Sequence, residues 1–417
     1  MQRRTIQVGE RLPLLQMLPL SLQHLFAMFG ATVLVPLLFK VDPGTILLFN
    51  GVGTLFYLVL CKGRIPAYLG SSFAFISPVL IVIGQYGYGA ALGGFVAAGL
   101  LFTLLALVIM KVGMRWLDVV FPPAAMGAIV AVIGLELAPV AAGMAGLTAE
   151  HIDLRAILVS MTTLAIVIVG SLVFRGFWGI IPIFIGVLCG YGLSFMLGIV
   201  DVQSIVNAQL ICLPTFYQPQ FNLSAIIIII PAALVVLAEH IGHLLVTGNI
   251  VGKDLTKDPG LGRSLLGNGL STMFSGFFGA TPNTTYGENI GVLAITRVYS
   301  VWVIGGAAVI AIIISFFGKA MQMIAAIPVP VMGGVSLLLF GVIAASGIRM
   351  LVEAKVDYSK PRNLILTSLV LVVGVSGAHI NIGAVQLSGM ALATVLGIGL
   401  SLLIKLGEIA GLVDKNK

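Results

Sequence analysis

The stretch TPNTTYGENIG, residues 281–291, decides the fold that we expect for this chain. It places a carboxylate, Glu288, among glycines, a proline and hydroxyl side chains within an otherwise apolar half of the sequence. In lipid every backbone N–H and C=O needs a partner, so an interrupted helix persists only where protein or a water-filled cavity supplies one. Such a break usually marks a substrate site. The stretch therefore predicts a binding site at membrane depth around Glu288.

Composition sets the class of protein. The chain has 417 residues, of which 59% are hydrophobic and only 9% are charged, and its mean hydropathy is +1.14. These values exclude a soluble domain and predict a polytopic membrane protein.

Apolar runs close to the 20 residues that a bilayer requires recur along the chain. We count about fourteen, with boundaries good to roughly four residues. They begin near Leu14, Gly44, Ile65, Ala90, Val119, Leu158, Trp178, Ser224, Gly260, Asn283, Ser300, Val329, Asn363 and Met390. The third and the tenth are the least regular, because residues 70–78 (GSSFAFISP) and 281–291 mix polar and helix-breaking residues. The irregular segments therefore fall third in each half.

The distribution of basic residues predicts the orientation. If the N-terminus is in the cytoplasm, only Lys40, Arg155 and Lys319 of the 22 Lys and Arg residues fall on the outer side of the membrane. The other 19 (22 − 3) fall on the cytoplasmic side. This bias follows the positive-inside rule and predicts that both termini are cytoplasmic. The net charge of +7 then needs no nucleic acid as partner, because the basic residues face anionic lipid headgroups.

Three of the 15 Asp and Glu residues, Glu136, Glu239 and Glu288, fall inside predicted spans. Carboxylates within the membrane are functional hypotheses by default. Glu239 lies in AALVVLAEHIGHLLVTGN, where His243 follows at i+4 and shares its helix face. His240 points roughly 100° away from Glu239 around the helix axis. A carboxylate and an imidazole stacked at membrane depth can share or pass a proton, which makes this pair a candidate coupling site.

Other interpretations of these residues stay open. Glu239 and His243 could form a buried hydrogen bond between helices. A metal site is disfavoured, because zincin-like helices place two His four apart with a Glu between, whereas His240 and His243 are three apart with the Glu outside. Glu136 could be a structural hydrogen bonder, an interface residue or a second proton site.

Glu288 sits where the tenth helix would resume, so the freed N–H groups of Tyr286 and Gly287 can point into the same cavity as its carboxylate. The first half offers backbone N–H groups, two hydroxyls and an aromatic ring at the matching position, from Gly70, Ser71, Ser72 and Phe73. Two broken segments that meet at mid-membrane make a pocket. A small planar solute with ring N–H donors and C=O acceptors suits it, and a nucleobase fits that description better than a sugar or an ion.

The stretch GENIGVLAITR, residues 287–297, resembles the signature of the nucleobase/ascorbate transporter (nucleobase:cation symporter 2) family. In that signature Glu-Asn-x-Gly is followed, after four residues, by Thr-Arg. The resemblance covers nearly the whole chain, including SLQHLFAMFGATVLVP at residues 21–36, SSFAFISP, AEHIGH and TPNTTYGENIG, and it is closest to the bacterial uracil permeases within the family.

The resemblance implies an all-α polytopic membrane protein of fourteen segments in two inverted seven-segment repeats, with segments 3 and 10 broken by short extended stretches. It implies a core domain formed by residues 1–116 (segments 1–4) and 223–320 (segments 8–11). Residues 117–222 (segments 5–7) and 321–417 (segments 12–14) are expected to form a gate domain. The implied activity is uracil:proton symport across the inner (cytoplasmic) membrane by alternating access of the core against the gate. We further expect a homodimer, no metal and no cofactor other than the proton as coupling ion.

The resemblance also assigns site residues. Glu239 and Glu288 look like the two uracil-binding carboxylates, and Phe73 and Gly287 look like the backbone amide donors. Tyr286 is similar to a residue of the pocket wall. His243 looks like the proton-coupling histidine, together with Glu239.

Further residues are implied around this site. Gln23 and His24 resemble the family's polar pair in the first helix, although they fit buried polar residues packed on the tenth segment equally well. Ser71, Ser72 and Asn289 would brace the pocket rather than bind the substrate. The chain departs from the uracil permeases at Phe340, where a tyrosine facing the pocket from the gate domain is expected. This departure puts fine specificity in question.

Rival functions are a different substrate on the same fold, such as xanthine, a larger purine or an anion, and also a channel or a membrane-embedded enzyme. An anion carrier would present a cation or bare helix N-termini to its ligand, whereas Glu239 and Glu288 would repel it. The sequence shows no filter motif, nucleophile constellation or metal triad that favours a channel or an enzyme.

Overall fold

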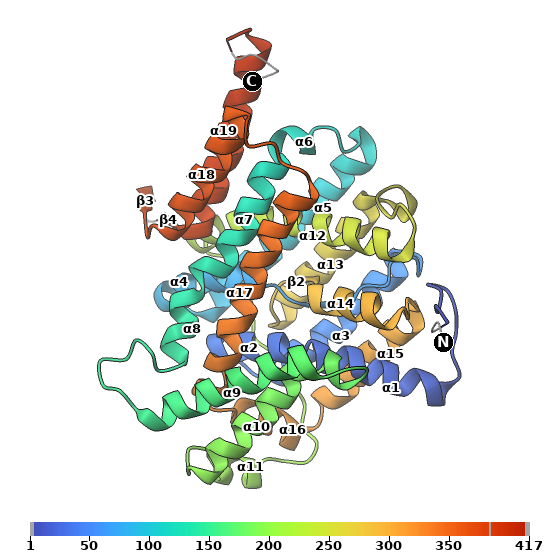
Figure 1. Cartoon of the computed structure of the whole chain (residues 1–417), viewed down its shortest axis with the longest axis vertical. Helices are drawn as coiled ribbons and strands as arrows, with labels where there is room; N and C mark the ends of the chain where they lie inside the picture. The colour runs from blue at the N-terminus through green and yellow to red at the C-terminus, as the bar shows by residue number, and fades with distance from the viewer. Residues whose placement is uncertain (1–3, 383–384, 413–417) are drawn as a thin grey trace.

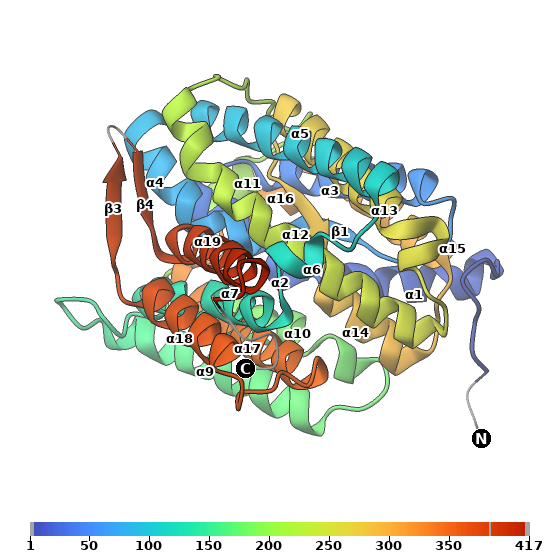
Figure 2. The ribbon, with the colours of Figure 1, turned by 90° about the horizontal axis from the view of Figure 1, so that it is seen from above.

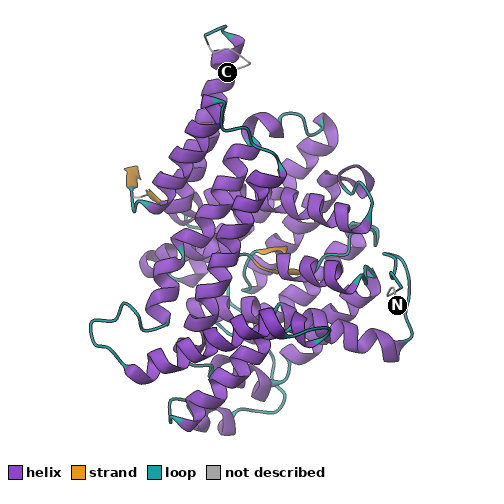
Figure 3. Cartoon of the chain, viewed as in Figure 1, coloured by secondary structure: helices purple, strands orange, loops and turns teal. Residues whose placement is uncertain are grey.

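The computed structural model describes residues 4–382 and 385–412, and within them the chain is almost entirely helical (Figure 1, Figure 3). The charges predict that both chain ends are cytoplasmic. Residues 1–3 and 413–417 belong to these ends and lie outside the described range.

The helices follow the predicted segments in chain order. The first half contains α1 (Leu14–Ala27) with α2 (Phe29–Phe39), α3 (Pro43–Leu60), β1 (Leu69–Ser71) with α4 (Ile76–Tyr86), α5 (Tyr88–Val112), α7 (Pro123–Glu136) with α8 (Ala138–Met144), α9 (Leu154–Val173) and α10 (Pro182–Met196). The second half contains α12 (Leu223–Val251), α13 (Leu261–Phe278), β2 (Asn283–Thr285) with α14 (Gly287–Thr296), α15 (Val301–Ser315) with α16 (Gly318–Ala325), α17 (Val329–Glu353), α18 (Pro361–Val375) and α19 (Gly389–Ile409). The largest differences from the predicted starts, such as Val119 against Pro123, are about four residues.

The remaining elements are short. They are the helices α6 (Leu117–Val120) and α11 (Val202–Asn207), the single turns Phe73–Phe75, Trp178–Ile180 and Thr256–Gly260, and the hairpin of β3 (His379–Ile382) and β4 (Val385–Ser388). This hairpin and the described N-terminal end lie at opposite edges of Figure 1.

Length and apolar composition confirm a polytopic membrane protein. Within the described residues, 7 helices are long and apolar enough to cross a bilayer, or up to 9 if each bent pair counts as one span. The bent pairs are α1 with α2, at 43°, and α15 with α16, at 91°. Shorter apolar helices at Phe73–Tyr86, α10 and α18 account for other predicted segments.

Helix packing repeats between the two halves. The contact of α5 with α13 (segments 4 and 9) has its counterpart in that of α15 with α3 (segments 11 and 2). In the same way, the contact of α12 with α5 (segments 8 and 4) has its counterpart in that of α1 with α15 (segments 1 and 11). The contact of α18 with α19 (segments 13 and 14) has its counterpart in that of α9 with α10 (segments 6 and 7). Seven segments is an odd number, so the second repeat enters the membrane from the opposite side. The packing is that of the predicted inverted repeat.

The two irregular segments meet in the middle of the molecule, where Figure 3 shows the short strands among the helices. Strands β1 and β2 pair antiparallel, with Gly70 opposite Thr284. The pairing continues on both sides, since the Tyr286 N–H donates to the Tyr68 carbonyl and the Ser72 N–H donates to the Pro282 carbonyl, each at 3.0 Å. Each broken segment thus supplies the backbone partners that the other lacks, which is what lipid requires of a non-helical stretch.

Helices α7 and α17 approach each other closely through small residues. A Cβ on Gly134 would lie 2.2 Å from the Phe340 carbonyl oxygen, and one on Gly347 would lie 2.2 Å from the Ala131 nitrogen. Only glycine permits this spacing, and small residues at such contacts are typical of membrane helices. The contact fixes the position of Phe340 at the centre of α17.

Asp42 fixes the extended segment that joins α11 to α12 against the start of α3. Its Oδ1 accepts a hydrogen bond from the Gly44 N–H at 2.8 Å and caps α3, while its Oδ2 accepts one from the Thr215 N–H at 2.7 Å. The Asp42 N–H itself donates to the Tyr217 hydroxyl at 3.0 Å. One side chain therefore serves a helix end and a loop from the opposite half of the sequence.

Asp42→Ala should lower the free energy of unfolding by about 1–2 kcal/mol, because it removes the cap of α3 and also the acceptor of the Thr215 N–H. Thermal unfolding in detergent measures the change. Asp201→Ala is the matched control, because Asp201 caps the exposed helix α11 through the Ser204 N–H. Equal shifts for the two variants would contradict the assigned role of Asp42.

Candidate functional site

Two helices begin at the central strand pair. Helix α14 starts at Gly287, directly after β2, and the turn Phe73–Phe75 leads from β1 into α4. Tyr286 precedes α14 and provides no side-chain cap, and the first backbone bond at this end runs from the Ile290 N–H to the Tyr286 carbonyl. The N–H group of Gly287 is thus left as a donor at the helix start.

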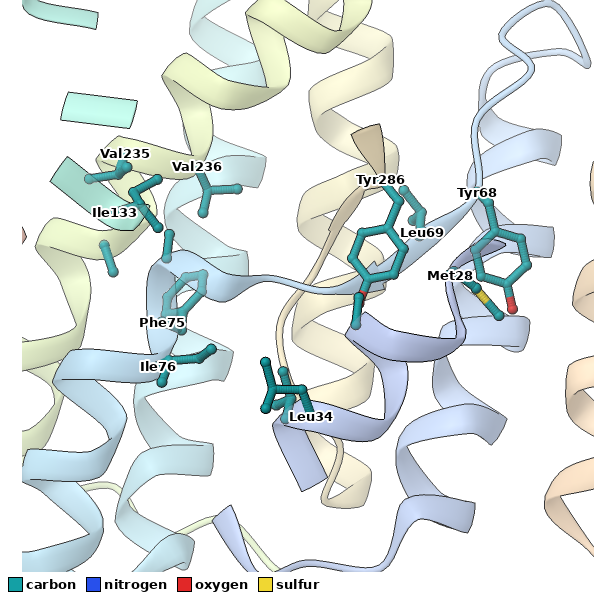
Figure 4. Packing of buried hydrophobic residues seen from close by; sticks show 14 of the residues in the cluster. Met28, Leu34, Tyr68, Leu69, Phe75, Ile76, Ile133, Val235, Val236 and Tyr286 are labelled. Atoms are coloured by element: carbon teal, nitrogen blue, oxygen red, sulfur yellow. The ribbon is translucent and has the colours of Figure 1, made fainter. Parts of the chain in front are cut away.

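Tyr286 contributes to the strand pair, whereas the break in the helix suggested that its N–H would point into the cavity. Its N–H donates to Tyr68 in the strand pair, so the expectation that this N–H faces the cavity is wrong. Its hydroxyl donates to the Ser71 carbonyl at 3.0 Å. A Cβ on Gly70 would lie 2.2 Å from Cε2 of the Tyr286 ring, so the ring lies directly on the glycine of β1. Figure 4 shows Tyr286 beside Leu69 at the strands.

Aromatic rings continue from Tyr286 toward α17. The rings of Tyr286 and Phe73 are stacked, with centroids 6.5 Å apart and planes at 27°. The Phe340 ring meets Phe73 edge to face at 6.1 Å. Phe340 is buried and carries no polar atom on its ring. These three residues, the aromatic row, join both broken segments to α17.

Helix α12 brings the carboxylate and the imidazole to the start of α14. Glu239 and Glu288 are both half-buried, and their carboxyl groups interact electrostatically. Nδ1 of His243 hydrogen-bonds to Oγ1 of Thr285 at 3.0 Å, and a Cβ on Gly287 would lie 3.4 Å from His243 Nε2. The structure thus brings Glu239, His243, Gly287 and Glu288 together.

His240 belongs to a separate polar group. Its Nε2 and the Ser264 hydroxyl are 2.8 Å apart, and the Ser264 hydroxyl lies 2.6 Å from the Tyr57 hydroxyl. His240, His243 and Thr285 nevertheless lie around one narrow gap in the packing, so the two polar groups are adjacent. The two histidines are three residues apart and therefore neighbours on the helix surface, yet they hydrogen-bond to different partners.

The residues expected to brace the site lie around the strand pair. Nδ2 of Asn289 lies 3.1 Å from His24 Nδ1 and donates to the His24 carbonyl at 3.1 Å, so His24 in α1 contacts the tenth segment. Gln23 is buried beside it in α1. The Ser71 hydroxyl lies 2.7 Å from the Thr281 hydroxyl. Ser72 is buried, and within the described part of the chain its hydroxyl has no hydrogen-bond partner.

Sequence reasoning missed Thr285, which holds His243 in place. Thr285 precedes Tyr286 in the motif that raised the hypothesis, but its role depends on β2 passing α12. Only the pairing of the two broken segments reveals that proximity.

The arrangement suits a flat, uncharged heterocycle. Two carboxylates can accept hydrogen bonds from ring N–H groups, the Gly287 N–H can donate to a ring carbonyl, and the aromatic row offers faces for stacking. His243 adds a group that can gain or lose a proton beside the carboxylates.

Comparison with protein families agrees with this chemistry. The model of the Permease family, Xan_ur_permease, matches residues 15–383. The chain belongs to this family. The resemblance to the nucleobase:cation symporter 2 family is thereby confirmed, and the family is one of transporters rather than enzymes.

Individual relatives are similar over nearly their full length. The chain is 67% identical to the uracil permease of Escherichia coli (strain K12) over 409 residues, which cover 97% of this chain and 95% of that protein. It is 64% identical to the uracil permease of Paenibacillus larvae, with 100% and 99% of the two chains covered. The uracil permease of Bacillus subtilis (strain 168) is 48% identical over 92% of this chain and 91% of its own.

Solved structures share the fold at low sequence identity. The transmembrane domain of the cyanobacterial bicarbonate transporter BicA is 14% identical with a TM-score of 0.64, covering 95% of this chain and 99% of that one. The structure of SLC26A9 is 12% identical with a TM-score of 0.71, covering 94% and 65%. These similarities confirm the architecture and carry no information on the substrate.

Gly70→Ala should destabilise the site, because the new methyl group would overlap the buried Tyr286 ring, which cannot move without breaking its bond to Ser71. Thermal unfolding in detergent should show a loss of about 1–3 kcal/mol. Gly84→Ala is the control in the same segment, since a Cβ at Gly84 meets nothing within 4 Å. A Gly70→Ala protein as stable as the Gly84→Ala protein would overturn the assigned contact.

Proposed function

We propose that this chain is a uracil:proton symporter of the cytoplasmic membrane. The observation that carries the proposal is the 67% identity to a uracil permease over 97% of the chain. The site supports it independently, because two carboxylates and a backbone donor match the N–H and C=O groups of a pyrimidine.

Each site residue then has a role at the substrate. Glu239 and Glu288 accept hydrogen bonds from uracil N–H groups, and the N–H groups of Gly287 and Phe73 donate to its carbonyls. Tyr286 forms a wall of the pocket, held by its hydrogen bond to Ser71. Ser72 braces the strands through the bond of its N–H to the Pro282 carbonyl, and Asn289 braces α14 through its bond to the His24 carbonyl.

Proton coupling is assigned to Glu239 and His243. They lie one helical turn apart on α12, and His243 is oriented by Thr285. A proton on either residue reduces the negative charge that Glu239 and Glu288 concentrate in one place, so the occupied carrier is favoured. Proton and uracil then cross together, and the inward proton gradient drives accumulation.

Helix packing supports a division into two moving parts. Residues 1–116 and 223–320 form the core domain, in which α3, α5, α13 and α15 pack on one another. Residues 117–222 and 321–417 form the gate domain, in which α7 and α9 pack on α17 and α18 packs on α19. In this scheme the core carries the substrate past the gate, and Phe340 is the gate residue that faces Phe73.

The proposal includes an orientation and an assembly. Both termini are cytoplasmic, in accord with the basic residues in the loops. The gate domain remains fixed in a homodimer while the core moves. Crosslinking in native membranes tests the dimer, and protease accessibility of the termini in sealed vesicles tests the orientation.

Counterflow of labelled uracil in proteoliposomes is the decisive test of the function. A saturable carrier exchanges labelled for unlabelled uracil, whereas a channel shows no counterflow and an enzyme converts the uracil. Competition by xanthine and other purines tests the alternative of another nucleobase on the same site. Stronger competition by xanthine than by unlabelled uracil would replace the substrate assignment.

Glu288→Ala should weaken uracil binding by about 100-fold or more, because it removes one of the two charged acceptors and leaves a uracil N–H without its partner. Isothermal titration of the purified protein measures the loss. Glu353→Ala is the matched control, since Glu353 is exposed and paired with Arg349 on α17. Wild-type affinity in Glu288→Ala would sink the site assignment.

Glu239→Gln should reduce the dependence of uptake on the proton gradient more than it reduces stability, because the amide keeps the shape but cannot take up the proton. Wild-type uptake should rise as external pH falls, since the proton moves inward with uracil. Uptake into vesicles with and without an imposed pH gradient measures both effects. Gradient-independent accumulation by the wild type would refute the symport mechanism.

A further inference from the structure

Glu136 is the third carboxylate inside a predicted span, and it lies apart from the central site. It is the last residue of α7 and is half-buried. Its Oε1 accepts a hydrogen bond from the Ser77 hydroxyl of α4 at 2.6 Å, and its Oε2 accepts one from the Met390 N–H of α19 at 2.9 Å. One side chain therefore joins three separate elements.

The bond to Met390 belongs to the gate side alone. Met390 is in the first turn of α19, where backbone N–H groups have no partner within the helix and favour a negative charge. Gly389 lies directly over the carboxylate, since a Cβ there would be 1.9 Å from Oε1. Glu136 is thus built into the start of α19, and α7 and α19 both belong to the proposed gate.

The bond to Ser77 crosses to the other part of the molecule. Ser77 follows Phe73 by four residues in the broken third segment, so it belongs to the helix that begins at the substrate site. A small cavity beside the bond is lined by Ile81 of α4 and by Gln386 and Ser388 of β4, and Glu136 is the ionisable group among the described residues of its lining. The seam between core and gate therefore runs through the Ser77–Glu136 bond.

Among the residues that the structure describes, the equivalent place in the second half has no such bond. Helix α14 begins at Gly287, and the first broken segment becomes helical again at Phe73, so these two residues correspond. Four residues further along each segment, Gly291 corresponds to Ser77. A Cβ on Gly291 would meet nothing within 4 Å, and Gly287 is exposed. The side of the site at which α4 begins, the α4 side, is thus fastened to the gate. The side at which α14 begins, the α14 side, has the exposed Gly287 and the uncrowded Gly291 in its place.

We propose that Glu136 is a positioning residue that latches the broken third segment to the gate on the α4 side of the substrate site. The proposal rests on the core-against-gate movement proposed above. When the core moves, the Ser77–Glu136 bond breaks while the Glu136–Met390 bond stays, so the latch favours the conformation that is closed on the α4 side and open on the α14 side.

The reporter for this proposal is a single cysteine at the seam. Ile81→Cys, in a protein whose Cys61, Cys189 and Cys212 are replaced by alanine, is labelled with a maleimide in nanodiscs without uracil. Ser77→Ala in this background should raise the labelling rate about fivefold, because one hydrogen bond to a charged group no longer favours the closed state. Glu136→Ala should raise it at least as much.

Ser401→Ala is the matched control. Its hydroxyl donates to the Val119 carbonyl at 2.9 Å, a bond between α19 and the adjoining turn of the gate. It removes a similar hydrogen bond without touching the seam, so the labelling rate should stay at the background value. If Glu136→Ala does not fold, Ser77→Ala still decides the question, since it leaves the cap of α19 in place.

Unchanged labelling in a folded Ser77→Ala protein would overturn the latch, and so would an equal rise in Ser401→Ala. Uracil titration of the same background protein is read separately. Absence of uracil binding there would contradict the proposed function, whereas normal uracil binding with unchanged labelling would contradict only the latch.

Discussion

The need of every backbone group for a partner at membrane depth is the constraint on which this structure depends. Segments 3 and 10 each contain a stretch that cannot be helical, and they meet these needs by pairing with each other as β1 and β2. The pairing places the starts of two helices at one point in the middle of the bundle. The remaining helices, α5 on α13 and α3 on α15 among them, surround that point.

Much of this architecture could be predicted from the sequence because membrane spans leave strong signals. Apolar runs gave the helix starts, and the polar stretch around Glu288 gave the break. The partners of the broken segments could not be predicted in the same way, since pairing of Gly70 with Thr284 joins residues from opposite halves of the chain. The free N–H predicted for Tyr286 was wrong for this reason, because the pairing uses it.

Side-chain roles were predictable where a residue acts within one helix and hidden where it acts between helices. The spacing of Glu239 and His243 on α12 indicated a shared face. Thr285, which orients His243, and Ser77, which binds Glu136, carry ordinary hydroxyls whose positions follow only from the fold. Glu136 itself could be recognised as unusual, but its two partners on α4 and α19 could not be named.

The same constraint bears on how the proposed site would discriminate between a neutral substrate and an anion. A helix that starts at mid-membrane presents unpaired N–H groups and a partial positive charge, which by itself favours an anion. In this chain Glu288 occupies the first turn of α14, and Glu239 faces it from α12. In the function we propose, these two carboxylates outweigh the partial positive charge of the helix start, so that an anion would be repelled and the backbone N–H at the break would act as a hydrogen-bond donor. On this proposal the selectivity depends on Glu288 at the break and on Glu239 in α12, while the break itself comes from the fold.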